Sequence, residues 1–117
     1  MNKIYKEITI ITVLYNSSDI VDSFFDSLKN FKIIVVDNGR NERILNKIQN
    51  YKNIQVISKN KNLGYGKAII FAFENVSTNF FLVLNPDLSI DVNSIENMLN
   101  IFKQYNNCGI VAPITLP

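Results

Sequence analysis

The chain has 117 residues, of which 47% are hydrophobic, and its net charge is only +2. This length fits one domain with a packed core, and the small charge argues against a surface built to bind nucleic acid or another polyanion. Histidine is absent, which excludes Ser-His triads, histidine acid–base catalysis and histidine metal ligands. A bound metal would need oxygen ligands, so Mg²⁺ or Mn²⁺ is favoured over zinc.

Repeated alternation of short strands and helices is the main structural signal. In chain order, we expect a strand at Ile8–Tyr15, a helix at about Asp19–Lys29, a strand at Lys32–Val36, a helix from Glu42 to about Tyr51, a strand at Ile54–Ile57, a helix from about Gly64 to Val76, a strand at Phe80–Leu84, a helix at Asp91–Tyr105 and a strand at Ile110–Ala112. The strand segments are apolar on both faces, as in buried parallel strands. This order predicts an α/β fold: a doubly wound, mostly parallel sheet with helices on both faces.

The cellular setting is predicted from features that the sequence lacks. Cys108 is the only cysteine, which gives no disulfide framework and fits a reducing compartment. We expect it to be a small buried residue near the start of a strand. The N-terminus shows no signal-peptide pattern, and no apolar run approaches the ~20 residues that span a bilayer. We therefore expect a cytoplasmic protein, including one that works at the inner face of the membrane.

Four polar stretches follow the predicted strands. They are Tyr15-Asn16, Asp37-Asn38-Gly39, Asn62-Leu63-Gly64-Tyr65-Gly66 and Asn85-Pro86-Asp87. Open α/β sheets bind ligands outside the carboxyl ends of their strands. Four stretches in this position therefore predict one ligand site at that edge of the sheet.

Each of these residues also has a purely structural interpretation. Asp37 can accept a hydrogen bond from a nucleobase or ribose, or it can cap the turn that follows it. Tyr15 can stack on a base, or it can be a core tyrosine whose hydroxyl reaches the surface. Asp87 can hold a divalent cation together with phosphates and water, or it can cap a turn fixed by Pro86.

The glycine-rich stretch differs from two familiar phosphate-binding motifs. A Walker loop requires Ser or Thr after Gly-Lys, whereas Ala68 follows Lys67, and a dinucleotide fingerprint requires a third glycine where Ile69 stands. Gly64 and Gly66 nevertheless allow close backbone approach at a helix start, where free N–H groups favour an anion. The alternative is an ordinary tight turn that leads into a helix.

The four stretches together resemble family 2 glycosyltransferases in order and spacing. The matching segments are Thr12-Val13-Leu14-Tyr15-Asn16, Val35-Val36-Asp37-Asn38-Gly39, Asn62-Leu63-Gly64-Tyr65-Gly66-Lys67-Ala68, Leu84-Asn85-Pro86-Asp87 and Ile110-Val111-Ala112-Pro113. The Asn-Pro-Asp variant looks most like the rhamnosyltransferase-like branch. The resemblance implies a GT-A, Rossmann-like fold and transfer of a sugar with inversion at the anomeric carbon.

The resemblance also implies roles for individual residues. Val13 and Tyr15 would lie beside the base of the donor, and Asp37 would hydrogen-bond that base. Gly64 and Tyr65 would lie near the donor. The segment from Asn85 to Asp87 would take the place of the family's Asp-x-Asp motif, with Asp87 binding a divalent metal, Mg²⁺ or Mn²⁺, on the diphosphate.

The resemblance covers nearly the whole chain but only the N-terminal half of the family's domain. We therefore expect residues 1–117 to be the donor-binding half, and the catalytic base, an Asp in the family, to belong to the acceptor-binding C-terminal half. The implied partners are a dTDP- or UDP-sugar and a glycan or lipid-linked acceptor, as in bacterial cell-surface polysaccharide synthesis. An uncovered sheet edge would also favour a homodimer.

Three other functions remain open at this stage. A nucleotidyltransferase uses a similar sheet but would show a Gly-rich basic loop after the first strand, where this chain has Asn16-Ser17-Ser18-Asp19. A receiver-like signalling domain would need a phospho-acceptor Asp after the third strand, where Ser58-Lys59 stands. The third is a truncated or degenerate transferase that only binds nucleotide or acts as a scaffold. No residue of the sequence argues against this function.

Overall fold

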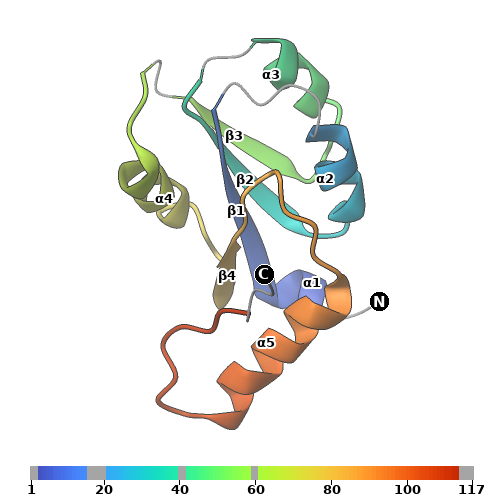
Figure 1. Cartoon of the computed structure of the whole chain (residues 1–117), viewed down its shortest axis with the longest axis vertical. Coiled ribbons are helices and arrows are strands. Elements are labelled where there is room, and N and C mark those ends of the chain that lie inside the picture. Colours follow the sequence, from blue (N-terminus) through green and yellow to red (C-terminus); the bar gives the residue numbers. More distant parts are fainter. Residues whose placement is uncertain (1–2, 16–20, 40–41, 59–60, 114–117) are drawn as a thin grey trace.

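The computed structural model describes residues 3–15, 21–39, 42–58 and 61–113 (Figure 1). Strands and helices alternate along this part of the chain, as the sequence predicts. They are α1 (Ile4–Glu7), β1 (Ile8–Leu14), α2 (Val21–Ser27), β2 (Lys32–Asp37), α3 (Glu42–Ile48), β3 (Ile54–Ser58), α4 (Tyr65–Phe73), β4 (Phe80–Val83) and α5 (Val92–Gln104). The predicted elements therefore agree with the structure to within a few residues up to the end of α5.

The four strands form one parallel sheet in the order β3-β2-β1-β4. In the register, Leu14 of β1 pairs with Asp37 of β2, while Ile11 pairs with Val83 of β4. The chain moves outward from β1 through β2 to β3 and then returns to the other side of β1 for β4. The strand order therefore reverses between β1 and β4, which is where sheets of this kind bind ligands.

The larger core lies between the sheet and helices α1, α2, α3 and α5. Successive side chains of a strand point to opposite faces, so this face takes the even-numbered residues of β1 and the odd-numbered residues of β2. Burial of each large apolar side chain contributes about 1.5–3 kcal/mol. The buried members are Ile4, Ile8, Ile10, Leu14, Phe24, Phe25, Leu28, Phe31, Ile33, Val35, Ile44, Ile48, Leu84, Ile95 and Leu99.

Among the described helices, only α4 packs on the opposite face of the sheet (Figure 1). Ala68 and Ala72 are four residues apart and lie on one side of this helix. Both are fully buried, and their small side chains let the helix approach the strands closely. This smaller core contains Ile11, Val13, Ile34, Val36, Ala68 and Ala72. Helices thus cover both faces, and the predicted doubly wound α/β fold is confirmed.

The predicted strand at Ile110–Ala112 is wrong. Residues 109–113 form no strand, and Ile110 is 88% exposed. After α5 the chain turns, and Cys108 N–H donates to the carbonyl of Tyr105 at 3.3 Å. A β-branched run forms a strand only when a neighbouring strand pairs with it, and no described strand does. Cys108 is consequently only partly buried and does not precede a strand.

The N-terminal residues form α1, which the sequence analysis did not predict. Its first turn closes through a hydrogen bond from Lys6 N–H to the carbonyl of Lys3 at 3.0 Å. Lys103 of α5 forms an ion pair with Glu7 at 3.0 Å and so links the two ends of the described chain. None of the described helices is long and apolar enough to cross a membrane.

Candidate functional site

Three of the predicted polar stretches follow strands at the carboxyl edge of the sheet (Figure 1), and Asn16 of the first stretch lies outside the described residues. Tyr15 follows β1 directly, Asn38 follows β2, and the turn at Asn85 follows β4. The fourth stretch leads into α4 at Tyr65, which starts at the same edge. Because the strands are parallel, all these segments lie on one side of the molecule.

Asn38 joins three of these segments. Its Nδ2 donates to the hydroxyl oxygen of Tyr15 at 3.2 Å and to the carbonyl of Gly64 at 3.3 Å. Its Oδ1 accepts from the N–H of Leu63 at 3.3 Å, and its own N–H donates to the carbonyl of Leu14 at 2.9 Å. The side chain is 4% exposed. Asn38 belongs to the predicted stretch Asp37-Asn38-Gly39, but its sequence position alone did not predict a binding or structural role for it.

A second link connects α4 to the turn after β4. The hydroxyl of Tyr65, the first residue of α4, donates to Oδ1 of Asn85 at 3.2 Å. The turn itself is closed by a hydrogen bond from Leu88 N–H to the carbonyl of Asn85 at 3.1 Å. These contacts bring two predicted site residues together across 20 positions of sequence.

Gly64 permits the sharp entry into α4. Its φ is +75°, a conformation that residues with a side chain rarely adopt. It is the residue before the helix, and its N–H donates to Oδ1 of Asn62 at 2.8 Å. Tyr65, Gly66 and Lys67 therefore carry the N–H groups of the first helical turn, which favour an anion at this end of α4.

Tyr15 offers an exposed aromatic ring at the end of β1. The residue is 40% exposed, while its hydroxyl oxygen accepts a hydrogen bond from Asn38. The ring is thus fixed at its polar end and partly exposed to solvent. This arrangement suits a residue that stacks on a planar ligand.

Asp37 is a buried residue at the end of β2. It is 3% exposed, and its Oδ1 accepts from the N–H of Gly39 at 3.1 Å. Asp37 therefore caps the turn after β2, which was the structural alternative considered for it. Its predicted contact with a nucleobase stays a prediction.

The side chain of Val13 points into the smaller core beneath α4 and is 4% exposed. A contact with a donor would therefore come from its backbone. Leu84 N–H donates to the carbonyl of Ile11 at 2.9 Å, and Asn38 N–H donates to that of Leu14. Since the direction of backbone polar groups alternates along a strand, those of Val13 face the β4 side, at the point where the strand order reverses.

Asp87 is exposed in the turn after β4. The described residues contain no group of three or more His, Cys, Asp or Glu side chains that could hold a metal ion together. Asn85 Oδ1 already accepts a hydrogen bond from Tyr65, and Asp87 supplies the one carboxylate of the Asn85-Pro86-Asp87 stretch. A single carboxylate fits Mg²⁺ or Mn²⁺ only when phosphate oxygens and water complete the coordination.

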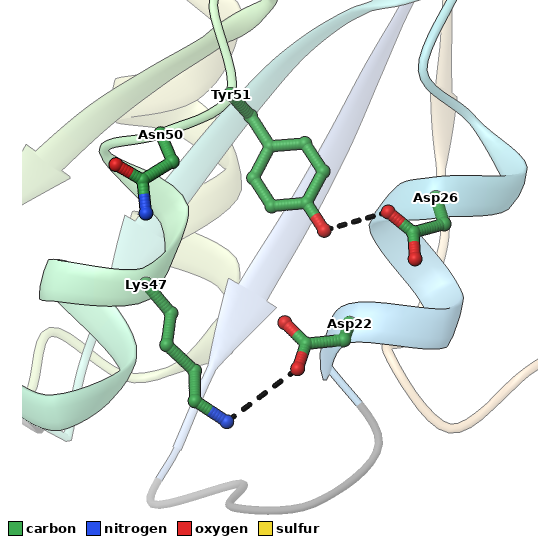
Figure 2. Close-up of a pocket in the computed structure, with 5 residues that line it drawn as sticks. All are labelled: Asp22, Asp26, Lys47, Asn50 and Tyr51. Atoms are coloured by element: carbon green, nitrogen blue, oxygen red, sulfur yellow. Dashed lines mark hydrogen bonds and ion pairs between the residues drawn. The ribbon is translucent and has the colours of Figure 1, made fainter.

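A separate polar pocket lies between α2 and the end of α3 (Figure 2), and none of the residues that line it belongs to the predicted stretches. Tyr51 donates to Oδ1 of Asp26 at 2.7 Å, and Lys47 pairs with Asp22 at 3.5 Å. The hydrogen bond to Asp26, together with burial and the charges of Asp26 and Asp22, raises the pKa of Tyr51 to about 12. The pocket is open to solvent. Its two contacts join α2 to α3 and to the segment that follows α3. These contacts have a structural role. No sequence motif marked it.

Comparison with known proteins gives matches over nearly the whole chain. Residues 9–116 match the family model described as glycosyl transferase family 2. A teichoic acid poly(glycerol phosphate) polymerase of Staphylococcus epidermidis is 31% identical over 97% of the chain, and a dolichol-phosphate mannosyltransferase of Pyrococcus furiosus is 24% identical over 89%. The matched regions cover 16% and 32% of those two proteins.

Solved structures support the same fold. A crystal structure of S. aureus TarS (residues 1–349) superposes with a TM-score of 0.70 and 20% identity, over 92% of this chain and 38% of that one. A mannosyltransferase from Pyrobaculum calidifontis, in complex with GDP-Man and Mn²⁺, gives 0.72 and 13% identity over 82% and 32%. At these identities the similarity establishes the GT-A glycosyltransferase fold.

Proposed function

The chain belongs to glycosyl transferase family 2, and we propose that residues 1–117 are the donor-binding half of an inverting sugar transferase. One observation supports this proposal: hydrogen bonds link the four predicted polar stretches. Asn38 links the second stretch to the first and the third, and the Tyr65–Asn85 pair links the third to the fourth. A structural turn after each strand would not require these long-range links. A shared ligand site at the strand-order reversal accounts for them.

In this proposal each segment meets a different part of a nucleotide-sugar. The exposed ring of Tyr15 stacks on the base, next to the backbone of Val13. Asp37 holds the turn beside them and, by the family resemblance, hydrogen-bonds the base. Gly64 and Tyr65 present the first N–H groups of α4 to the diphosphate.

Asp87 is the residue that would hold a divalent ion against the diphosphate, with Asn85 oriented beside it by Tyr65. Bound there, Mg²⁺ or Mn²⁺ would stabilise the negative charge that develops on the leaving nucleoside diphosphate. The complex of the Pyrobaculum calidifontis mannosyltransferase with GDP-Man and Mn²⁺ supports metal use by a protein of this fold.

The proposed reaction is a direct displacement. An acceptor hydroxyl attacks the anomeric carbon as the bond to the diphosphate breaks, and a general base takes the hydroxyl proton. By the family resemblance this base is an Asp of the acceptor-binding half, and no residue of this chain is assigned that role. We therefore expect the 117-residue chain to bind a donor and to transfer sugar poorly or not at all.

The proposed partners are a dTDP- or UDP-sugar and a glycan or lipid-linked acceptor. The names of the two curated relatives, a poly(glycerol phosphate) polymerase and a dolichol-phosphate mannosyltransferase, support an acceptor of this general kind. Synthesis of a bacterial cell-surface polysaccharide is part of the same proposal. The rhamnosyltransferase-like branch stays a prediction.

A homodimer is the proposed assembly, formed along the β4 edge. β4 is the last strand of the described sheet on that side. Phe81 of β4 and Phe73 of α4 are 43% and 54% exposed and stack edge to face with ring centroids 5.3 Å apart. An edge strand with apolar neighbours is a template for a second copy. Light scattering of Phe81→Lys should show a monomer; wild-type chain that is monomeric at high concentration contradicts the dimer.

Calorimetric titration with UDP, dTDP and GDP, each with and without Mn²⁺, tests the proposed function. We expect one nucleotide to bind more tightly with Mn²⁺, and Asp87→Ala to abolish that enhancement. Glu74→Gln, at the far end of α4, is the matched control and should bind as wild type does. A folded chain that binds none of the three nucleotides would instead favour a degenerate or scaffolding role.

A further inference from the structure

We infer that Asn38 is a positioning residue that holds the Tyr15 ring and the Gly64-Tyr65 turn in the arrangement that accepts the nucleotide. This inference deepens the proposed function and rests on it. Asn38 itself meets no ligand in this scheme. It acts through the two segments that it joins.

The side chain of Asn38 uses both ends of its amide. The NH2 group has two protons, and these serve Tyr15 and Gly64, while Oδ1 serves Leu63. An asparagine has two donors and two acceptor positions, so three of the four are engaged. A side chain that is 4% exposed and engaged in this way has one stable orientation.

The partners of Asn38 belong to segments that are far apart in sequence. Tyr15 lies 23 positions before it, and Leu63 and Gly64 lie 25 and 26 positions after it. The anchor is itself fixed, because Asn38 N–H donates to the carbonyl of Leu14 in the central strand. The β3–α4 loop is thus tied to the sheet through this one side chain at Leu63 and Gly64.

This tie also reaches Tyr65. Gly64 has the positive φ that starts α4, and its carbonyl accepts from both Asn38 Nδ2 and Ala68 N–H. A shift of Gly64 therefore moves the first helical turn and the Tyr65 hydroxyl, which contacts Asn85. Loss of the Asn38 amide should therefore loosen both the Tyr15 side and the Gly64-Tyr65 side of the proposed nucleotide site.

Asn53 provides a matched control. Its Nδ2 also donates to two backbone carbonyls, those of Phe31 at 2.7 Å and Leu28 at 3.4 Å. It is partly buried, but it precedes β3 at the amino edge of the sheet, opposite the site. Asn53→Ala should therefore lower the melting temperature without changing nucleotide affinity.

The first measurement needs no ligand. In Asn38→Ala, hydrogen exchange of the Leu63 amide should become about tenfold faster, because that N–H loses its acceptor. The Ile11 amide in the central strand should keep its protection, and Asn53→Ala should leave Leu63 unchanged. Should Asn38→Ala fail to fold, Asn38→Ser replaces it in both measurements, since its shorter side chain cannot span three partners.

The second measurement is the affinity for whichever of UDP, dTDP and GDP the wild-type chain binds. Asn38→Ala should raise the Kd roughly tenfold, the scale of one lost ordering contact. Asn38→Asp should bind no more tightly than Asn38→Ala, because it keeps the acceptor for Leu63 but sets a buried carboxylate oxygen against the Gly64 carbonyl. Unchanged Leu63 exchange, or an unchanged Kd in a folded Asn38→Ala, would overturn the inference. If wild type binds no nucleotide, the proposed function fails, while the exchange measurement still decides the coupling.

Discussion

The hydroxyl of Tyr65 donates a hydrogen bond to Oδ1 of Asn85 at 3.2 Å, which joins the first residue of α4 to the turn after β4. Helix α4 packs against β1 and β2, whereas the turn follows β4, which lies on the other side of β1 from β2. The contact therefore spans the place where the strand order reverses, and it sets the distance between the helix start and the acidic turn.

We expect Tyr65→Phe to weaken nucleotide binding by roughly up to tenfold, the effect of one lost hydrogen bond, with little change in melting temperature. Tyr105→Phe is the matched control, because Tyr105 is 55% exposed and lies after α5. Calorimetric titration of both variants measures the effect. Equal affinities in the two variants would show that the Tyr65–Asn85 contact does not shape the site.

Replacement of two threonines of β1 should have different effects on the free energy of unfolding. Thr9 and Thr12 are both fully buried. Thr9 Oγ1 lies 2.7 Å from Thr78 Oγ1, and Thr78 donates its own proton to the carbonyl of Phe80. Thr12 Oγ1 has no hydrogen-bond partner among the described residues. Thr9→Val should cost about 1 kcal/mol, whereas Thr12→Val should be neutral or stabilising, because it removes an unsatisfied hydroxyl.

Urea denaturation of the two threonine variants measures this difference. Both substitutions replace a hydroxyl with a methyl group on the same strand, so volume and β-propensity change alike. A clear loss of stability in Thr12→Val would mean that its hydroxyl has a partner.

Tyr51 makes stability depend on alkaline pH. Its pKa is raised from 10.0 to about 12 in the folded chain, chiefly by the hydrogen bond to Asp26. The folded state holds this proton more tightly than the unfolded state. The stabilisation is therefore complete below pH 10 and is lost as the pH rises to about 12.

Thermal melts of wild type and Tyr51→Phe between pH 8 and 12 check this prediction. The variant should be less stable at pH 8, and the difference should shrink above pH 10. Tyr105→Phe should show no such trend. A constant difference up to pH 12 would argue that the hydroxyl of Tyr51 does not titrate with the fold.

Asp91 makes stability depend on acid pH. It caps α5 by accepting from Ser94 N–H at 2.7 Å, and this bond holds the pKa of Asp91 below its usual 3.8. The stabilisation is thus present above pH 3.8 and is lost as the pH falls through the lower folded value. Asp91→Ala should melt at a lower temperature at pH 7, and the gap should narrow in acid.

Asp91→Asn separates the cap from the charge, because asparagine is an equally good N-cap. Its melting temperature should stay near that of wild type at pH 7 by circular dichroism. A loss as large as that of Asp91→Ala would indicate that the charge, rather than the hydrogen bond, stabilises this helix.

The fold could be predicted from local pattern because the strands are short runs of β-branched and apolar residues between helical periods. Ile33 to Val36 is buried on both faces, which is what an uninterrupted apolar run implies in a parallel sheet. The same reasoning failed at Ile110, because none of the strands in the described part of the chain pairs with this run. Local preference cannot supply that partner.

The candidate site was predicted as a place rather than as a set of contacts. The rule for parallel sheets locates the edge, but the role of Asn38 depends on hydrogen bonds to Tyr15 and Gly64 that no spacing in the sequence reveals. Because asparagine is common in this chain, the presence of Asn38 after Asp37 did not by itself indicate a special role. The burial of Asp37 likewise depends on tertiary packing.

Chemical-shift mapping by NMR tests whether the segments that follow the strands form one nucleotide-binding site. A ¹⁵N-labelled chain is titrated with UDP, dTDP and GDP in the presence of Mg²⁺, and the shifted amides are assigned. We expect shifts at Tyr15, Asn38, Gly64 and Tyr65 on the carboxyl edge of the sheet. Shifts confined to the pocket around Asp26 and Tyr51, or no shifts with any of the three nucleotides, would contradict this expectation.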